Sequence, residues 1–185
     1  MQTSQFLSQI IEELQQSVGL ISDEEAEMLM TSILESKKVF VAGSGRSGFM
    51  AKSFAMRMMH MGIDAYVIGE TVTPTFEKDD ILIIGSGSGE TKGLVSIAEK
   101  AKAIGGKIAV VTLSPDSTIG RLADFTVKLP GASKDQTDST YQTIQPMGSL
   151  FEQTLLLFYD ALILRFMHKK GLDTNKMYGN HANLE

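Results

Sequence analysis

Short runs of valine and isoleucine alternate with helix-length segments through the middle of this 185-residue chain. The runs that we expect to be strands are 39–42, 65–68, 81–84, 108–112 and 125–129, and the expected helices between them are 47–61, 90–104 and 117–123. Alternation of this kind is typical of strands joined by crossover helices, which makes the sheet parallel. Because the runs at 81–84 and 108–111 are apolar at every position, they suit central strands covered on both faces. The pattern predicts an α/β fold, a three-layer sandwich with a five-stranded parallel sheet flanked by helices.

Helical patterns precede and follow the predicted strands in the sequence. Apolar residues recur at helical spacing between 6 and 14, and Ser22 with Glu25 forms a capping-box pattern, so we expect N-terminal helices within 1–36. A long helix is expected at 149–169, where apolar residues cover nearly every face, as in helices that are buried all round. One α/β layer can cover only one side of it, so we expect another subunit on the other side. No linker divides the chain, which predicts a single domain, 1–185.

Charge and composition exclude several classes of partner. The net charge of −5, from 17 Lys and Arg against 22 Asp and Glu, gives no broad basic surface for nucleic acid. The longest apolar segment, 155–167, contains Asp160 and Arg165 and is shorter than the roughly 20 residues of a bilayer span, so no membrane partner is expected. Residues 1–16 lack the features of a secretion signal, and the absence of cysteine excludes disulfides and Cys-bound metals. A cytoplasmic location is the simplest reading.

Two of the expected strands run directly into loops of glycine and serine, "GSGRSG" at 43–48 and "GSGSGET" at 85–91. In an open parallel sheet, ligands bind at the carboxyl ends of the strands, where both loops should lie. Glycines let backbone amides approach an anion, and the helix that follows supplies unpaired N–H groups. The hydroxyls of Ser86, Ser88 and Thr91 add enough donors to surround a phosphate without a lysine or a metal. These loops predict a site for a small phosphate monoester.

Two other interpretations of the glycines compete with this one. Gly43, Gly45 and Gly48 fit the dinucleotide-binding fingerprint, and Glu70 follows at the distance of its ribose-binding acid. That fingerprint does not explain the second loop. Alternatively, both stretches are only tight turns, although turns alone do not require so many hydroxyls.

Six short motifs carry a resemblance to a known family. The two loops, "GSGRSG" and "IIGSGSGET", resemble the sugar-phosphate loops of the sugar isomerase (SIS) family. More narrowly, "FAMRMMHMG", "GETVTP", "QPMGSLFEQ" and "HANLE" resemble the 6-phospho-3-hexuloisomerases within it. The resemblance implies the SIS fold, with a flavodoxin-like strand order, and interconversion of D-arabino-3-hexulose 6-phosphate and fructose 6-phosphate. It implies no metal and no cofactor.

The resemblance also implies a biological setting. The 6-phospho-3-hexuloisomerases act in the ribulose monophosphate pathway of formaldehyde fixation, which implies a cytoplasmic homotetramer, a dimer of dimers, working with 3-hexulose-6-phosphate synthase. Two alternatives stay open, namely an isomerase of another sugar phosphate, such as an arabinose or heptose phosphate, and a non-catalytic module that senses a phosphosugar.

Glu152 is the expected catalytic base. Moving a carbonyl between carbons 2 and 3 requires a base that takes a proton from the neighbouring carbon and returns it through a cis-enediol, and one carboxylate can do both. Glu152 follows the polar stretch 131–146, itself a candidate lid or binding loop, and lies near the start of the last helix. Its alternative role is to stabilise the helix start. The predicted substrate and phosphate contacts are Ser44, Arg46, Ser47, Ser86, Gly87, Ser88, Gly89, Glu90 and Thr91.

Two histidines complete the candidate catalytic residues. His60 ends a methionine-rich helix, where a structural role is the usual alternative to substrate contact. His181 lies near the C-terminus in "NHANLE", and in related isomerases a histidine of a neighbouring subunit completes the site. Arg46 could bind phosphate or an acid across a subunit contact, or form only a surface salt bridge.

Overall fold

The computed structural model describes residues 2–132, 134 and 141–184, so most of the polar stretch from 133 to 140 lies outside the described residues. Its centre is one five-stranded, all-parallel sheet in the order β2-β1-β3-β4-β5. The strands are β1 (Val39–Gly43), β2 (Ala65–Val67), β3 (Ile81–Gly85), β4 (Lys107–Thr112) and β5 (Phe125–Lys128). The predicted parallel sheet and its flavodoxin-like order are confirmed.

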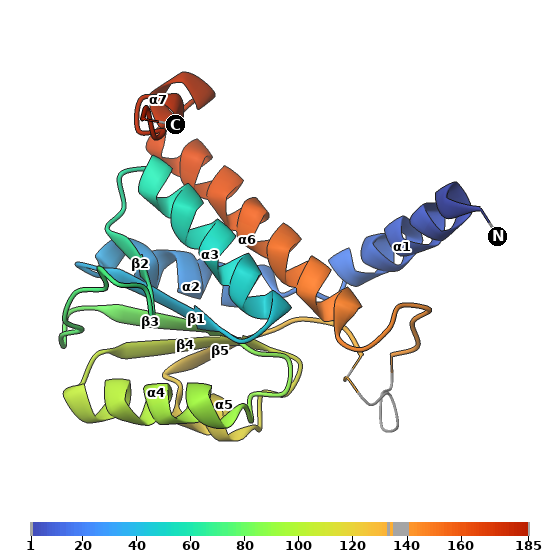
Figure 1. Cartoon of the computed structure of the whole chain (residues 1–185), viewed down its shortest axis with the longest axis horizontal. Coiled ribbons are helices and arrows are strands. Elements are labelled where there is room, and N and C mark those ends of the chain that lie inside the picture. Colours follow the sequence, from blue (N-terminus) through green and yellow to red (C-terminus); the bar gives the residue numbers. More distant parts are fainter. Residues whose placement is uncertain (1, 133, 135–140, 185) are drawn as a thin grey trace.

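Helices cover both faces of the sheet, as predicted (Figure 1). One face packs against three helices, α2 (Asp23–Glu35), α3 (Arg46–His60) and α6 (Ser149–Lys170). Alternate side chains of β1 and β3 point to this face, and those between them point to the other. The other face packs against α4 (Lys92–Ile104) and α5 (Thr118–Leu122). Both central strands are therefore buried on both sides, which explains why their sequences are continuously apolar.

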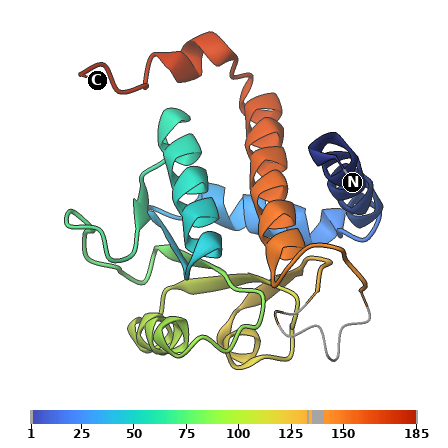
Figure 2. The same cartoon turned by 45° about the vertical axis from the view of Figure 1, so that its right-hand side comes forward.

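The first helix, α1 (Thr3–Val18), extends away from the body of the molecule, and α7 (Thr174–Tyr178) lies beyond the far end of α6 (Figures 1 and 2). Ser17 is the one residue of α1 that is buried. Its apolar side chains Phe6, Leu7 and Ile11 are 47%, 56% and 57% exposed. The stripe that predicted an amphipathic helix thus has little to pack against within this chain.

Helix α6 is covered on most, but not all, of its circumference. Tyr159 stacks on Phe54 of α3 with ring centroids 4.2 Å apart, and the side chains facing the sheet are buried. Leu157 and Leu164 remain 50% and 65% exposed. A groove of about 310 Å³ runs between α1 and α6, and Leu157 is part of its wall. None of the helices that the structure describes is long and apolar enough to cross a bilayer.

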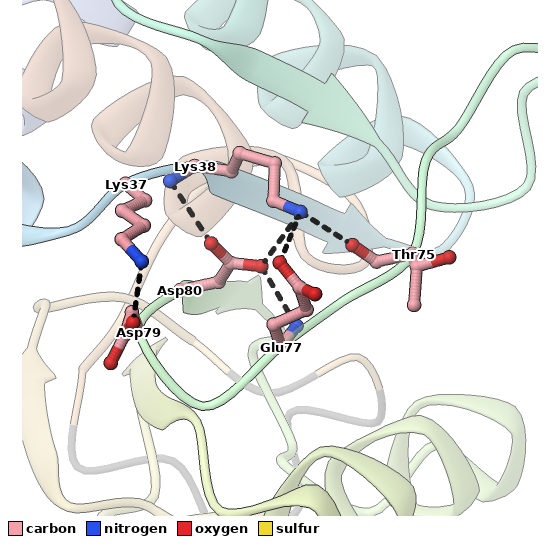
Figure 3. Close-up of polar contacts among 6 residues, drawn as sticks. All are labelled: Lys37, Lys38, Thr75, Glu77, Asp79 and Asp80. Atoms are coloured by element: carbon pink, nitrogen blue, oxygen red, sulfur yellow. Dashed lines mark hydrogen bonds and ion pairs between the residues drawn. The ribbon is translucent and has the colours of Figure 1, made fainter.

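A charged cluster fixes the amino ends of β1 and β3 (Figure 3). The Asp80 carboxylate is fully buried and accepts hydrogen bonds from the backbone N–H groups of Lys38 (3.1 Å) and Glu77 (2.8 Å). The Lys38 ammonium lies 3.3 Å from the same carboxylate and donates to the Thr75 carbonyl at 2.7 Å. The cluster ties the loop before β3 to the start of β1, at the edge of the sheet opposite the glycine loops.

Candidate active site

Register brings the two glycine loops together. Gly43, the last residue of β1, pairs with Gly85, the last residue of β3. In this strand order the crossover connections change direction between β1 and β3, which is where ligands bind in open α/β sheets. The two loops therefore leave the sheet side by side.

The first loop owes its glycines to close packing between β1 and α3. A Cβ atom on Gly43 would lie 2.9 Å from the Cα atom of Gly48, closer than real Cβ contacts allow. Any larger residue at either position would push α3 away from the strand end. The spacing that resembles a dinucleotide fingerprint thus brings the start of α3 onto the sheet edge.

The second loop is stiffened by its own hydroxyls. The Ser86 Oγ accepts a hydrogen bond from the Gly89 N–H, and the Ser88 Oγ accepts one from the Glu90 N–H, both at 3.2 Å. A hydroxyl that accepts such a bond keeps its own proton for another acceptor. A Cβ atom on Gly89, which has a φ of +63°, would lie 1.9 Å from the Ser117 Oγ, so only glycine fits there. The loop is held in shape while its hydroxyl protons remain available for a ligand.

Three helices begin at this edge without a side-chain cap: α3 after Gly45, α4 after Thr91 and α6 after Gly148. By contrast, α2, α5 and α7 are each capped by the side chain that precedes them. The first N–H groups of an uncapped helix need partners, and the helix dipole favours an anion there. Apart from α1, which begins with a capping box of Gln2 and Gln5, the helices of the described part of the chain that lack a side-chain cap all begin where the loops meet.

A cavity of about 510 Å³ lies between these elements. The described residues that line it include Ser44, Ser47, Ser86, Gly87, Ser88, Thr91 and Glu152, which the sequence predicted as site residues. Glu152, in the first turn of α6, is 8% exposed. Arg46 Nη1 lies 3.2 Å from its Oε2 atom and donates to the Ser149 hydroxyl at 2.9 Å. The carboxylate is thus held at the wall of the cavity that the hydroxyl loops also line.

Arg46, Gly89 and Glu90 were predicted to contact substrate but do not line the cavity. The Arg46 guanidinium lies against Glu152, and the Gly89 carbonyl accepts a hydrogen bond from the Ile119 N–H of α5 at 3.1 Å. The Glu90 carboxylate turns away to accept the Thr118 N–H of α5 at 2.7 Å. This backbone hydrogen bond lowers the pKa of Glu90. All three residues lie next to the cavity wall and contact residues of α5 or α6.

His60 and His181 lie together at the other end of the molecule. Their rings stack with centroids 5.3 Å apart, beside Tyr178 and Arg57. The start of α3 lies at the cavity and His60 is its last residue. The 15 residues of this helix place His60 about 20 Å from the cavity. Within one subunit neither histidine reaches the cavity, so a role on substrate requires a neighbouring subunit and stays a prediction.

Lys134 was missed as a site residue. It lines the cavity together with Ser114, Gly148 and Phe151. In the sequence Lys134 stands in the polar stretch after the last strand, without a spacing that singles it out. Lys134 is far from the glycine loops in the sequence and comes close to them only in the folded chain.

The dinucleotide interpretation gains no support from this geometry. The Glu70 carboxylate forms an ion pair with Lys52 of α3 and is not among the described residues that line the cavity. The first loop shares its cavity with the second, which the fingerprint leaves unexplained.

Comparison with known proteins identifies the family. The SIS domain model matches residues 32–160, which include both glycine loops and Glu152. The chain belongs to the SIS family. The family resemblance of the sequence motifs is thereby confirmed.

Several SIS relatives share most of their length with this chain. A Bacillus subtilis (strain 168) protein named 3-hexulose-6-phosphate isomerase is 56% identical over 185 residues, 100% of both chains. A Mycobacterium gastri protein of the same name is 38% identical over 179 residues, covering 97% of this chain and 89% of its own. The crystal structure of a Methanococcus jannaschii protein, with an inferred function of 3-hexulose-6-phosphate isomerase, is 34% identical and superimposes with a TM-score of 0.84 over 98% of this chain and 99% of its own.

Proposed function

We propose that this chain is a 3-hexulose-6-phosphate isomerase, which interconverts D-arabino-3-hexulose 6-phosphate and fructose 6-phosphate. The observation that carries the proposal is one cavity lined both by a nearly buried carboxylate, Glu152, and by the hydroxyls of two glycine loops. The 56% identity to the Bacillus subtilis relative over its full length supports the choice of substrate.

The phosphate of the substrate is proposed to bind at the start of α4. Ser86, Ser88 and Thr91 line the cavity there, and α4 has no side-chain cap on its first N–H groups. A phosphate would satisfy those donors and accept the free hydroxyl protons. Lys134, also in the cavity wall, would add a positive charge to the same anion.

Glu152 is proposed as the base. In the direction of fructose 6-phosphate formation, its carboxylate removes the proton from C2 of the 3-ketose, and the electron pair of that bond forms the 2,3-enediolate. The protonated carboxyl group, whose proton can exchange with solvent in the meantime, then delivers a proton to C3 while the hydroxyl proton of O2 passes to O3, so the carbonyl moves to C2 without net loss of atoms or electrons. The reaction assigns no step to a metal or cofactor. The ion pair with Arg46 supports this role because it fixes the carboxylate of an otherwise flexible side chain.

We propose further that the chain assembles with copies of itself through α1 and α6. Their exposed apolar residues, among them Phe6, Ile11, Leu157 and Leu164, support this contact. The family resemblance favours a homotetramer, a dimer of dimers, in which the partner subunit's His181 completes each site. Cytoplasmic location and action beside 3-hexulose-6-phosphate synthase, which supplies the 3-ketose, belong to the same proposal.

Deuterium exchange tests the reaction type directly. Purified protein is incubated with fructose 6-phosphate in deuterated water, and the sugar is examined by proton NMR. A base that forms the 2,3-enediolate exchanges the proton on C3, whereas an aldose–ketose isomerase acting through the 1,2-enediol would exchange one on C1. We expect exchange at C3 together with appearance of the 3-ketose.

The remaining outcomes distinguish the alternatives. Exchange at C1 alone would assign the chain to another isomerase class. Neither exchange nor formation of the 3-ketose, with phosphosugar binding retained by calorimetry, would identify a sensing module and overturn the proposal.

A further inference from the structure

Glu13 makes the main polar contact between α1 and the segment that leads into α6. One carboxylate oxygen accepts hydrogen bonds from the Thr143 hydroxyl at 2.6 Å and from the Gln145 amide at 2.9 Å. The other accepts the Ile144 N–H at 2.7 Å. Burial raises the pKa of Glu13, but these hydrogen bonds outweigh it and the net pKa is lowered. Three consecutive residues, far from Glu13 along the chain, are therefore held by one ionised side chain.

The segment held by Glu13 leads into the helix turn that carries the proposed base. Gln145 is buried, and the next residues reach α6 through Met147, a non-glycine residue with a φ of +55°. Such a conformation costs energy and persists only where surrounding contacts impose it. Gly148 follows as the N-terminal boundary of α6, and its carbonyl accepts the Glu152 N–H at 3.0 Å. The position of residues 143–145 thus sets how the chain enters the turn that carries Glu152.

Glu13 has no part in the proposed proton transfer. Glu13 is not among the described residues that line the cavity. The first half of its helix is largely exposed, so α1 does not need Glu13 to cover a core. What the side chain does satisfy is three donors at the entrance to α6.

We infer that Glu13 is a positioning residue: by holding Thr143, Ile144 and Gln145, it sets the first turn of α6 and with it the carboxylate of Glu152. The inference rests on the proposed function for its effect on turnover. It makes the α1 helix part of the site's construction, although α1 contributes nothing to the cavity wall that the structure describes.

Substitution of Glu13 should affect turnover more than phosphate binding. Glu13→Ala removes all three hydrogen bonds, whereas Glu13→Gln keeps one acceptor and presents an N–H₂ group to donors. Small displacements of a reacting group can cost about 100-fold in rate. We expect kcat to fall about 10- to 100-fold in Glu13→Ala and by less in Glu13→Gln. The inhibition constant of inorganic phosphate should stay within about twofold, because its proposed hydroxyl contacts lie on the β3–α4 loop and Lys134 lies outside the residues that Glu13 holds.

Glu12→Ala is the matched control, since Glu12 is the adjacent acid of α1 and is exposed. It should keep wild-type kcat. Thr143→Val should reproduce part of the Glu13 effect, and the double variant Glu13→Ala/Thr143→Val should lose less than the product of the two single losses. Sedimentation of each variant must give the wild-type species, so that dissociation does not account for the loss.

Hydrogen exchange separates this inference from the proposed reaction. Amides of 144–145 and of 149–152 should exchange faster in Glu13→Ala than in Glu12→Ala, while the α4 amides stay unchanged. If wild-type protein proved inactive on the 3-ketose, the proposed function would fail, and this exchange pattern would still decide the role of Glu13. Unchanged exchange at 149–152 or, where the wild type is active, equal kcat in Glu13→Ala and Glu12→Ala would overturn the inference.

Discussion

Arg46 and Glu152 join the starts of two helices across the candidate site. The guanidinium of Arg46, in the first turn of α3, lies 3.2 Å from the carboxylate of Glu152, in the first turn of α6. Arg46 is half exposed and Glu152 is nearly buried. The cation faces solvent while the anion faces the cavity, which suits a base that must reach a substrate.

Replacing Glu152 by Gln should abolish most turnover while leaving phosphate binding intact. The amide keeps the shape and can still face Arg46 through its oxygen, but it cannot take a proton from carbon. We expect kcat to fall by about two orders of magnitude or more, with the phosphate inhibition constant nearly unchanged. Steady-state kinetics with competing inorganic phosphate measure both. Near-normal turnover would remove Glu152 from the mechanism.

Replacing Ser86 or Ser88 by Ala, or Thr91 by Val, should weaken substrate and phosphate binding together. Each change removes one hydroxyl donor, so we expect a loss of roughly 0.5 to 3 kcal/mol in binding free energy. Ser96→Ala, on the exposed side of α4, is the control and should bind normally. Calorimetry with fructose 6-phosphate and with fructose tests the assignment, which is wrong if the unphosphorylated sugar binds equally well.

Charges placed on the exposed face of α6 should break the proposed assembly. Leu157→Asp and Leu164→Asp lie at positions that are 50% and 65% exposed, so the folded subunit tolerates them while a dry interface does not. We expect smaller species by sedimentation and reduced activity, with circular dichroism unchanged. Val72→Asp, at an 84% exposed loop position, should change neither. A wild-type monomer at micromolar concentration would contradict the interface, and a fully active dissociated variant would contradict the shared site.

Stability should fall in acid because of His60. Burial, followed by the nearby Arg57 and His181, lowers the pKa of His60 below its ordinary 6.5. Between 6.5 and that lowered pKa the unfolded chain binds more protons at this residue, so the free energy of unfolding decreases as the pH falls through this window.

Chemical denaturation at about pH 7.5 and about pH 5.5 measures this effect. His60→Gln should lose less stability between the two than wild type, whereas the exposed control His168→Gln should follow wild type. Identical pH dependence in all three proteins would show that His60 does not titrate as expected.

Asp80 should matter for stability and not for catalysis. Asp80→Ala leaves two backbone N–H groups without their acceptor in a fully buried place, which should lower the free energy of unfolding by about 2 to 4 kcal/mol. Its neighbour Asp79 pairs with Lys37 in solvent, so Asp79→Ala should change stability little. Urea denaturation compares the two, and equal losses would count against the buried cluster.

The sheet could be predicted because its signal is local. Apolar runs such as 81–84 and 108–111 bury both faces wherever they lie, and the strand bounds in the structure differ from the predicted ones by a single residue. The signal for the loops at Gly43 and Gly85 was also local, because each glycine cluster directly follows its strand in the sequence.

Contacts between distant segments were the part that could not be predicted. Arg46 was expected to bind phosphate, to bind an acid across a subunit contact or to form only a surface salt bridge. In the structure its guanidinium pairs with Glu152, and nothing in the sequence pairs positions on two different helices. Lys134 and Glu13 were not predicted as site residues for the same reason. The contacts of both depend on the path of the segment before α6. His60 and His181 do adjoin one another, yet they lie at the end of α3 away from the cavity, which depends on the direction of that helix.

The pairing of Gly43 with Gly85 also determines where the chain can be altered. Any residue inserted within β1 or β3 would slide one glycine loop past the other and change the shape of the cavity that both loops line. The connection between β2 and β3 starts at the carboxyl end of β2 and enters β3 at its amino end. Its residue Val72 is 84% exposed, whereas Thr75 and Glu77 are held by Lys38. New termini or an inserted domain could therefore be placed around Val72, ahead of Thr75, because this exposed residue is not among the described residues that line the cavity.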